Sequence, residues 1–523
     1  MSLHHNGRRA KGLHVAAGLI LVLGMLSSSA LGDLYVWTDG GGSNASLWNA
    51  KQNWAVDNKQ ANNPPANGSD VQLTGAGSSG PTIQNIANLS LKTLLFDSTC
   101  GTFTVAGNAF TLTDSGTALT VDAGAGALGI SCHIALGNSQ SWFIGAGRTF
   151  TVSGNVTGNA KSLTKTGDGT LVLTGTNSYS GGTTISAGAI KGNATSLQGN
   201  ITDNAVLEFA QASDATYSGN ISGTGSFVKS GAGTLTLAGT NSYGGGTTIS
   251  AGALKGDATS LQGNITINGT LIFDQGTNAT YSGALSGNGT FTKTGAGKLK
   301  LTGDSGFTGT TIVSQGKLQV TGSLASSVIT IESGGMVIGS GTLDSMVVRN
   351  GGVISPGSSP GTTDTGSQTW ESGGIYLWEV SKVTAGGGSQ ESLKGQNPGA
   401  DFYNITGTLN ITATAGGKFV IDIAGLLEDT EDTQGAVTNW NPTGTYSWVI
   451  VTASGGISGF DADAFDLQTG KFTSNNSIAS GYGFSIGQDG NSVVLTYAPE
   501  PATLALLGAG GALLLFQRRR RPA

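Results

Sequence analysis

Apolar and polar residues alternate along the middle of this chain with the period of a β-strand. Pairs of leucines with one residue between them precede glycine-rich turns, and they recur at Leu171 and Leu173, Leu235 and Leu237, and Leu299 and Leu301. A side-chain period of two is typical of a strand that buries one face, whereas an amphipathic helix repeats every three or four residues. The pattern therefore predicts short strands joined by turns, with no long helix.

A longer period of 64 residues lies over this alternation. Lys165 stands in the segment Thr-Lys-Thr-Gly-Asp-Gly-Thr-Leu, and related segments reappear around Lys229 and Lys293. Self-similarity at fixed spacing indicates a solenoid in which each unit buries its apolar face against the next. Coils of roughly 20 to 24 residues would give about three coils for each unit. We therefore predict an all-β protein built on a right-handed parallel β-helix, over residues 73–354.

Regions of different composition flank the repeats. Residues 33–72 contain Trp37, Trp48 and Trp54, which we interpret as a cap that plugs the first coil, although exposed tryptophans would instead stack on sugar rings. Residues 355–498 begin with a Pro-rich breaker and are rich in aromatic residues. We expect a C-terminal β domain there that caps the last coil.

The repeats resemble a known group, the autotransporter-associated β-strand repeats of bacterial surface proteins. The matching residues are 169–173, Gly175, Asn177, Tyr179, 181–184 and Gly188, and again 233–237, Gly239, Asn241, Tyr243, 245–248 and Gly252. The third copy departs from the pattern, with Ser305 in place of the asparagine. The resemblance implies an extended β-helical passenger and no enzyme chemistry.

The end of the chain contains a three-part pattern. Pro499, Glu500 and Pro501 precede an apolar run, 502–516, and the basic residues Arg518, Arg519, Arg520 and Arg521 follow it. This pattern resembles the PEP-CTERM sorting segments of bacteria with a double membrane. The resemblance implies that an exosortase-type transpeptidase recognises residues 499–523 as a sorting motif and removes the tail after export. Fifteen apolar residues make about 22 Å of helix, shorter than the roughly 30 Å hydrocarbon core, so the helix would hold the chain in the inner membrane only transiently. A permanent anchor that is never cut is the alternative.

The first 32 residues have the pattern of a secretory signal peptide. Arg8, Arg9 and Lys11 precede an apolar stretch, 13–26, and small residues follow up to Gly32. We expect removal by signal peptidase, which places the mature protein at the cell envelope, at the outer surface or outside the cell. Without the signal and the tail arginines, 18 basic side chains face 31 acidic ones, a net charge of about −13. An acidic exported protein is a poor candidate for binding nucleic acid.

The residues that carry catalysis are sparse. After removal of the signal the chain keeps one histidine, His133, so a multi-histidine zinc site is excluded. The Gly-x-Ser-x-Gly matches at Ser359 and Ser485 lie in a breaker and in a predicted hairpin strand, where no helix follows. Asp168 becomes alanine in both later repeats, so acidic residues do not stack into a catalytic face. We predict no catalytic, cofactor or metal site.

Three further features leave alternatives open. An acidic run would either bind a calcium ion or form a solvated loop, and we favour the loop; its residues are Glu428, Asp429, Glu431 and Asp432. Cys100 and Cys132 would form a disulfide or stay reduced. For the whole chain we predict a structural or adhesive β-solenoid of the cell surface or extracellular matrix, with a surface polysaccharide as candidate partner. The alternative is a polysaccharide-active enzyme or a carbohydrate-binding protein on the same fold.

Overall fold

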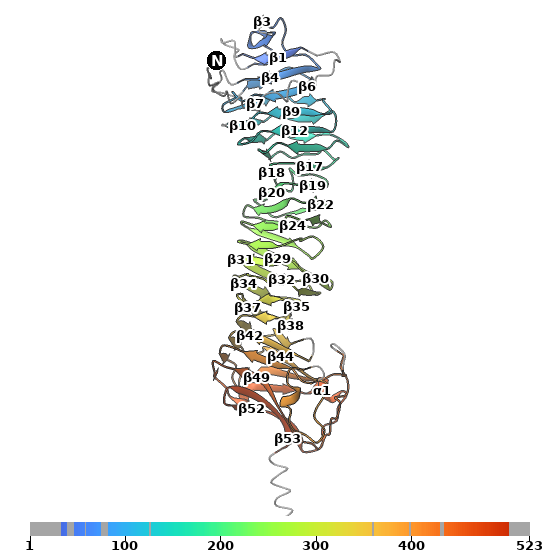
Figure 1. Cartoon of the computed structure of the whole chain (residues 1–523), viewed down its shortest axis with the longest axis vertical. Coiled ribbons are helices and arrows are strands. Elements are labelled where there is room, and N and C mark those ends of the chain that lie inside the picture. The colour runs from blue at the N-terminus through green and yellow to red at the C-terminus, as the bar shows by residue number, and fades with distance from the viewer. Residues whose placement is uncertain are drawn as a thin grey trace, which may run out of the picture.

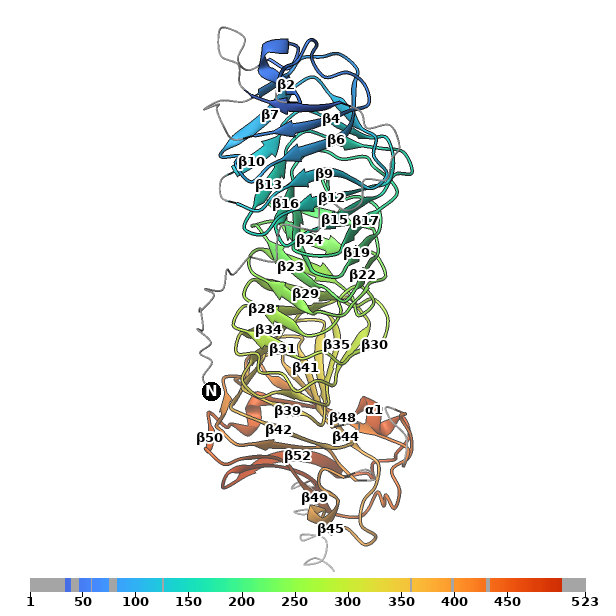
Figure 2. The same cartoon turned by 45° about the horizontal axis from the view of Figure 1, so that its top comes forward.

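The computed structural model describes most of the chain between the two predicted targeting segments. The described residues are 33–38, 47–57, 59–74, 82–124, 127–357, 360–396, 399–428 and 433–500. The predicted signal peptide, and the tail from Pro501 onward, lie outside these residues. Short strands cross a long column from its N-terminal to its C-terminal end (Figure 1), and the turned view shows coil stacked upon coil (Figure 2).

Sheets A and B begin at the N-terminal end of the column. Sheet A contains β1 (Leu34–Trp37), β2 (Trp54–Val56), β3 (Lys59–Gln60), β4 (Ser69–Leu73), β6 (Leu89–Phe96), β8 (Phe110–Leu112), β9 (Thr117–Val121), β11 (Ile134–Leu136), β12 (Gln140–Ile144), β14 (Val156–Thr157), β15 (Leu163–Thr166), β17 (Thr183–Ile185), β19 (Ile201–Asp203), β22 (Ile221–Gly223) and β25 (Ser242–Tyr243). Sheet B contains β5 (Thr82–Gln84), β7 (Phe103–Gly107), β10 (Ala127–Ile130), β13 (Thr149–Val152), β16 (Thr170–Leu173), β18 (Ala189–Gly192), β20 (Val206–Ala210), β23 (Ser226–Ser230), β26 (Thr247–Ile249), β28 (Ile265–Ile267) and β31 (Leu285–Gly287).

The other three sheets continue the column to its C-terminal end. Sheet C contains β21 (Ala215–Tyr217), β24 (Thr234–Leu237), β27 (Ala253–Gly256), β29 (Thr270–Asp274), β32 (Thr290–Thr294), β34 (Thr310–Val313), β37 (Val328–Ile331), β40 (Met346–Val348), β43 (Gln368–Trp370), β47 (Leu409–Ile411) and β50 (Ile457–Ser458). Sheet D contains β30 (Ala279–Tyr281), β33 (Lys298–Leu301), β35 (Gly316–Val320), β38 (Gly335–Gly339), β41 (Val353–Pro356), β44 (Ile375–Val380), β48 (Phe419–Gly425) and β51 (Phe465–Gln468). Sheet E contains β36 (Ser323–Leu324), β39 (Thr342–Leu343), β42 (Thr362–Thr365), β45 (Gly388–Ser389), β46 (Phe402–Ile405), β49 (Tyr446–Ala453), β52 (Tyr482–Asp489) and β53 (Ser492–Pro499).

Helical structure is slight within the described residues. It consists of α1 (Gly470–Thr473) and the 3-10 turns η1 (Lys51–Asn53), η2 (Glu391–Leu393) and η3 (Ala462–Ala464). The ladders along the column are parallel, whereas the antiparallel strand pairs lie near its ends, in β1–β2, β2–β3, β49–β53 and β52–β53. The predicted all-β fold with a parallel β-helix is therefore confirmed.

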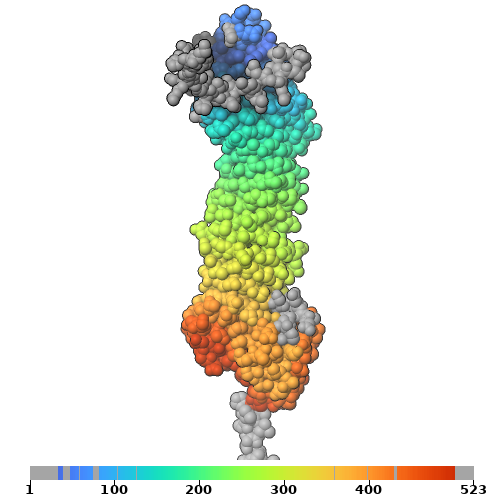
Figure 3. All heavy atoms as spheres, in the orientation of Figure 1, coloured from blue at the N-terminus to red at the C-terminus, as the bar shows by residue number. Residues whose placement is uncertain are grey.

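Alternate residues of the strands fill the core, as the sequence pattern predicts. In β24, Leu235 and Leu237 are 0% and 2% exposed, whereas Thr234 and Thr236, which alternate with them, face outward. The same side chains stack from coil to coil, with Leu235 paired in register with Leu254. One continuous apolar core therefore runs along the column, which is drawn as packed spheres in Figure 3.

The 64-residue period does not contain a whole number of coils. Register pairs carry Lys165 to Ile185 and Ile185 to Asp203, and with the next coil three successive coils take 20, 18 and 20 residues. These three coils fall six residues short of the period. Six residues amount to one side of a three-sided coil, so each repeat unit is turned by one face relative to the unit before it.

Sheet membership shows this rotation directly. The three equivalent strands β15, β23 and β32 belong to sheets A, B and C respectively. The loop at residues 193–200 of the first unit returns at 257–264 of the second, where it falls between strands of sheets C and B. That second loop occupies the face of sheet A, which ends at β25, and sheet D takes over the same face from β30 onward. Equivalent residues of successive units therefore point in different directions around the column.

Both ends of the column are closed by aromatic side chains. Trp37, Trp48 and Trp54 are at most 2% exposed, and the ring of Trp54 contacts the other two edge-on at 4.9 and 5.4 Å. They pack inside the first coil and do not form an exposed platform for sugars. At the other end, β52 and β53 form a hairpin whose turn is at Gly490 and Asn491, so Ser485 lies in a hairpin strand as predicted. The parallel ladders also run past the breaker at residue 355, because β41 pairs with β44 and β44 with β48.

Candidate functional surface and C-terminal segment

Sheet A presents a file of hydroxyl groups to the outside, one on each of seven consecutive coils. The residues of this hydroxyl ladder are Thr117, Ser141, Thr164, Thr184, Thr202, Ser222 and Ser242, which stand beside one another in register. All seven are exposed or half-buried. Neighbouring parallel strands lie about 4.8 Å apart, so the ladder offers regularly spaced, uncharged donors and acceptors.

Inside the column, each repeat unit holds one buried lysine in a cage of carbonyl groups. The Lys229 ammonium donates hydrogen bonds to the carbonyl oxygens of Ser230 at 2.8 Å, Gly231 at 2.8 Å and Ala251 at 3.2 Å. Lys165 and Lys293 make the same three contacts in their own units. All three side chains are 0% exposed. Since a protonated amine has three donors, each cage satisfies the ammonium completely.

The electrostatics of these cages balance two effects. Burial lowers the pKa of Lys165 and of Lys293 to about 8, because desolvation disfavours the charged form, and it lowers the pKa of Lys229 in the same direction. Attraction to a nearby carboxylate acts the other way and raises the pKa, from Asp168 for Lys165, from Asp214 for Lys229 and from Asp274 for Lys293. With pKa values of about 8, Lys165 and Lys293 are mostly charged at neutral pH, and the hydrogen bonds of all three lysines link coils inside the column.

A buried asparagine joins three coils in each of the first two units. The side-chain oxygen of Asn241 accepts a hydrogen bond from Ile221 N at 2.8 Å, and its amide nitrogen donates to Ser260 O at 2.7 Å. Asn177 repeats this arrangement in the first unit. In the third unit Ser305 keeps only the acceptor half, taking a 3.0 Å hydrogen bond from Leu285 N.

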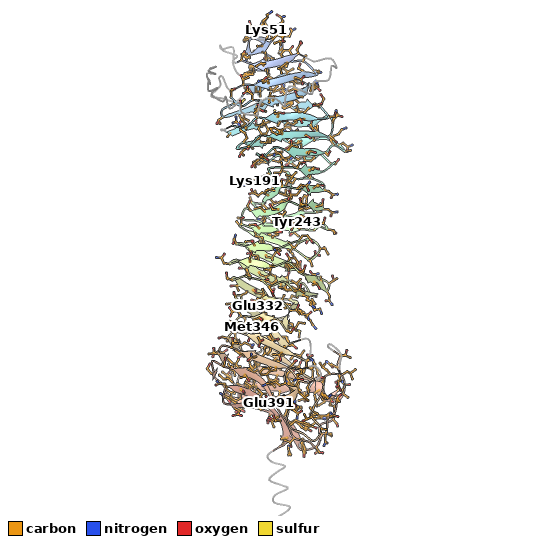
Figure 4. All side chains as sticks on the ribbon, in the orientation of Figure 1. Lys51, Lys191, Tyr243, Glu332, Met346 and Glu391 are labelled. Atoms are coloured by element: carbon orange, nitrogen blue, oxygen red, sulfur yellow. The ribbon has the colours of Figure 1, made fainter. Side chains whose placement is uncertain are left out.

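A tyrosine and a threonine pair beside each asparagine. The hydroxyl of Tyr243, which lies within the column (Figure 4), is 2.9 Å from Thr247 Oγ1, and Tyr179 makes the equivalent contact with Thr183 at 2.8 Å. These residues, which carry the resemblance in the sequence, are thus buried structural contacts and not a ligand site.

The predicted sorting motif begins where the described structure ends. Pro499 is the last residue of β53 and pairs with Tyr482, and the next residue, Glu500, is exposed and donates its backbone N–H to Gly481 O at 2.7 Å. Pro501 and Arg518, Arg519, Arg520 and Arg521 lie outside the described residues, so the motif as a whole remains a prediction. None of the helices in the described parts of the chain has the length and apolar character that a membrane span requires.

The described residues bring no catalytic constellation together. His133 lies between β10 and β11, whereas Ser485 lies in β52, and β10 and β52 are far apart along the column in Figure 1. Asp168 is exposed. In the part of the chain that the structure describes, no three His, Cys, Asp or Glu side chains group as metal ligands would.

The remaining candidates have individual environments. Cys100 and Cys132 are buried as free thiols, and burial raises the pKa of each to about 12. Glu428 pairs with Lys382 at 2.8 Å, while the other three residues of its acidic run lie outside the described residues. Asp203 is 0% exposed and points into the core, where one oxygen accepts from Ala205 N at 3.0 Å. Burial raises the pKa of this carboxyl to about 6.

Comparison with known proteins identifies the repeats. The family model named Passenger-associated-transport-repeat matches residues 163–191, 227–255 and 291–320, and each matched segment contains one caged lysine. The Adhesin BmaC autotransporter of Brucella suis biovar 1 (strain 1330) is 34% identical over an alignment that covers 28% of this chain and 5% of that protein. The chain thus matches only a small part of that relative. The predicted autotransporter-type repeats are confirmed by these similarities.

Sequence reasoning recognised the repeated residues but missed what several of them do. The burial of the caged lysines could have been predicted, because Lys229 stands two residues after Phe227 in the same strand and its side chain therefore points to the core as that of Phe227 does. Asp203 gave the same signal, as it stands where the second unit has Ile267. The burial of Lys229 and Asp203 was missed because charged residues are ordinarily expected to be exposed.

Proposed function

We propose that this protein is an exported, cell-surface or extracellular-matrix β-solenoid with a structural or adhesive role and no enzyme activity. The observation that carries the proposal is that a passenger-type repeat builds a continuous column whose hydroxyl ladder faces outward. The column is closed at both ends, and hydrogen bonds of buried lysines join its coils. The similarity to a protein described as an adhesin supports the adhesive role.

We further propose that signal peptidase removes residues 1–32, and that an exosortase-type transpeptidase reads the tripeptide Pro499, Glu500 and Pro501. The apolar run 502–516 would hold the exported chain in the inner membrane, with Arg518 to Arg521 on the cytoplasmic side. Exposure of Glu500 directly after a paired strand supports this, because the enzyme would find the tripeptide next to a rigid support.

The sorting proposal is tested by Glu500→Ala in the native host. Export should be unchanged, since the N-terminal signal directs it, but tail removal should stop and the protein should accumulate in the membrane. Asp489→Ala, which removes another exposed acid from the same hairpin, is the matched control and should be processed normally. Mass spectrometry of the surface protein decides, because an intact terminus at Ala523 in the wild-type protein would show that the segment is a plain anchor.

Carbohydrate binding is the second candidate function, and the hydroxyl ladder favours it. An uncharged file with a regular spacing of about 4.8 Å suits hydrogen bonding to a neutral polysaccharide. Replacing Thr184 and Thr202 with valine should weaken binding in a polysaccharide panel, whereas the same change at Thr236 and Thr292 on sheet C should not. Product release, measured separately, distinguishes binding from catalysis, and turnover of any polysaccharide would overturn the non-enzymatic reading.

A further inference from the structure

The end strand β52 differs from the other strands at the ends of the sheets. Within the described residues, each of the other end strands has two to four residues, whereas β52 has eight and pairs with β53 over eight consecutive positions without a register shift. Proteins ordinarily keep such edges short or place lysine, proline or a bulge on them to prevent pairing with another chain. The end strand β3 follows that rule, with two residues that include Lys59.

The sequence of β52 contains none of these protections. It reads Tyr-Gly-Phe-Ser-Ile-Gly-Gln-Asp, so its charged residue is Asp489 at the very end. Tyr482, Phe484 and Ile486 share one face, where they pack half-buried against the core, and Ser485 on the opposite face is exposed. The strand is thus an uncharged edge along most of its length.

Hydrogen-bond geometry shows which backbone groups face outward from this edge. Gly481 O accepts from Glu500 N, and the hairpin register continues from that pair through Asp489 and Ser492. Because direction alternates along an antiparallel strand, the odd-numbered residues of β52 are directed at β53. The backbone groups of Phe484, Ile486 and Gln488 are therefore directed at the edge where no further strand of the described residues pairs.

We propose that two copies of this chain associate by antiparallel pairing of β52 with β52, about a two-fold axis at Ser485. Residues directly opposite one another in an antiparallel pair have their side chains on the same face of the sheet. In a pair of identical strands, opposed residues must therefore both be even-numbered or both odd-numbered, which requires that the axis pass through a residue and not between two residues. With the axis at Ser485, Phe484 faces the partner's Ile486 and Ser485 faces the partner's Ser485. Asp489 faces the partner's Gly481, so the two carboxylates do not meet. This self-complementarity selects a second copy as the occupant, and the association is additional to the proposed surface role.

Cysteine cross-linking of the full-length protein in detergent tests the register. In Ser485→Cys the two thiols would lie on directly opposed residues whose Cα atoms are about 4.5 Å apart, within reach of a disulfide, so mild oxidation should give a covalent dimer. In Gln488→Cys, on the same strand and also exposed, the stagger separates the thiols by about 20 Å, and the variant should stay monomeric. Cys100 and Cys132 are buried and do not compete.

Sedimentation velocity gives the independent measurement. The wild-type protein and Ser485→Thr should show the dimer, whereas Ser485→Lys, which opposes two ammonium groups at the axis, should be monomeric with an unchanged circular dichroism spectrum. A wild-type protein that stays monomeric at its highest attainable concentration would overturn the proposal. Equal cross-linking of the Ser485→Cys and Gln488→Cys variants, or a dimer that survives Ser485→Lys, would overturn it as well.

Discussion

Lys229 and Ala251 lie on consecutive coils, and a 3.2 Å hydrogen bond from the lysine ammonium to the alanine carbonyl joins them inside the column. The same link joins Lys165 to Ala187 and Lys293 to Gln315, so it recurs once in each matched repeat. Because successive units are rotated by one face, the three buried lysines lie on three sides of the column. The repeat thereby stabilises all sides of the β-helix in turn.

Replacing Lys229 with methionine should lower the free energy of unfolding by about 2 to 4 kcal/mol. The variant keeps the apolar stem but leaves three carbonyl oxygens without their donor, which costs more than the loss of an exposed charge. The matched control is Lys255→Met in the same unit, where the half-exposed ion pair with Asp274 at 2.8 Å contributes about 0 to 1 kcal/mol. Urea unfolding measures both. Equal effects of the two changes would mean that the cage contributes no more than a surface ion pair.

The third repeat suggests a graded test of the asparagine. Asn241→Ala should destabilise the protein by about 2 to 4 kcal/mol, since Ile221 N and Ser260 O both lose their partner in the core. Asn241→Ser, which copies the solution at Ser305, should restore the acceptor and cost about half as much. Hydrogen exchange of the Ile221 amide reports the contact directly. If the serine variant exchanges as fast as the alanine variant, the hydroxyl does not replace the amide.

The strand pattern and the repeat length were predictable from the sequence because both follow from local spacing. Leu235 and Leu237 face the core as their alternation predicts, and Ser485 lies in a hairpin strand, β52, as predicted. The rotation between units was not predictable, because coil length depends on how many residues each turn uses, and turns of different length give coils of 18 and 20 residues. The estimate of about three coils for each unit was therefore close, but it left out the extra side of a coil by which each unit exceeds three coils.

The polar contacts were harder still to foresee, because they compensate for one another across units. The third unit has Phe307 where the earlier units have tyrosine, so Thr311 loses the hydroxyl partner that Tyr243 gives to Thr247. There Thr311 Oγ1 pairs instead with Ser327 Oγ at 2.6 Å. Sequence comparison of the units shows the substitution at Phe307 but not which distant serine replaces it.

Truncation of Leu235 to alanine tests the core along sheet C. The side chain is fully buried, so the change should leave a cavity and cost about 2 to 5 kcal/mol, whereas Thr236→Ala, which alters the outward neighbour, should cost less than about 0.5 kcal/mol. The loss should spread to adjacent coils, because each coil is stabilised by its neighbours. Thermal unfolding of the two variants decides. An unchanged melting temperature for Leu235→Ala would contradict a packed core at this position.

Asp203 should make the stability of the column depend on pH in a direction opposite to that of most carboxylates. Burial raises its pKa to about 6 from the ordinary value of 3.8, so between these values the folded chain binds more protons than the unfolded one. Stability therefore falls as pH rises from about 4 to 6, by about 3 kcal/mol for two pKa units, and stays lower above pH 6.

Asp203→Ile, which copies Ile267 and Ile331 of the later units, should remove this loss and be more stable than the wild-type protein at pH 7. Asp203→Asn should also abolish the pH dependence, whereas Asp304→Asn at an exposed position should leave it intact. Urea unfolding at pH 4, 5, 6 and 7 measures the four proteins, and parallel curves for the wild type and Asp203→Asn would show that the carboxyl does not titrate in this range.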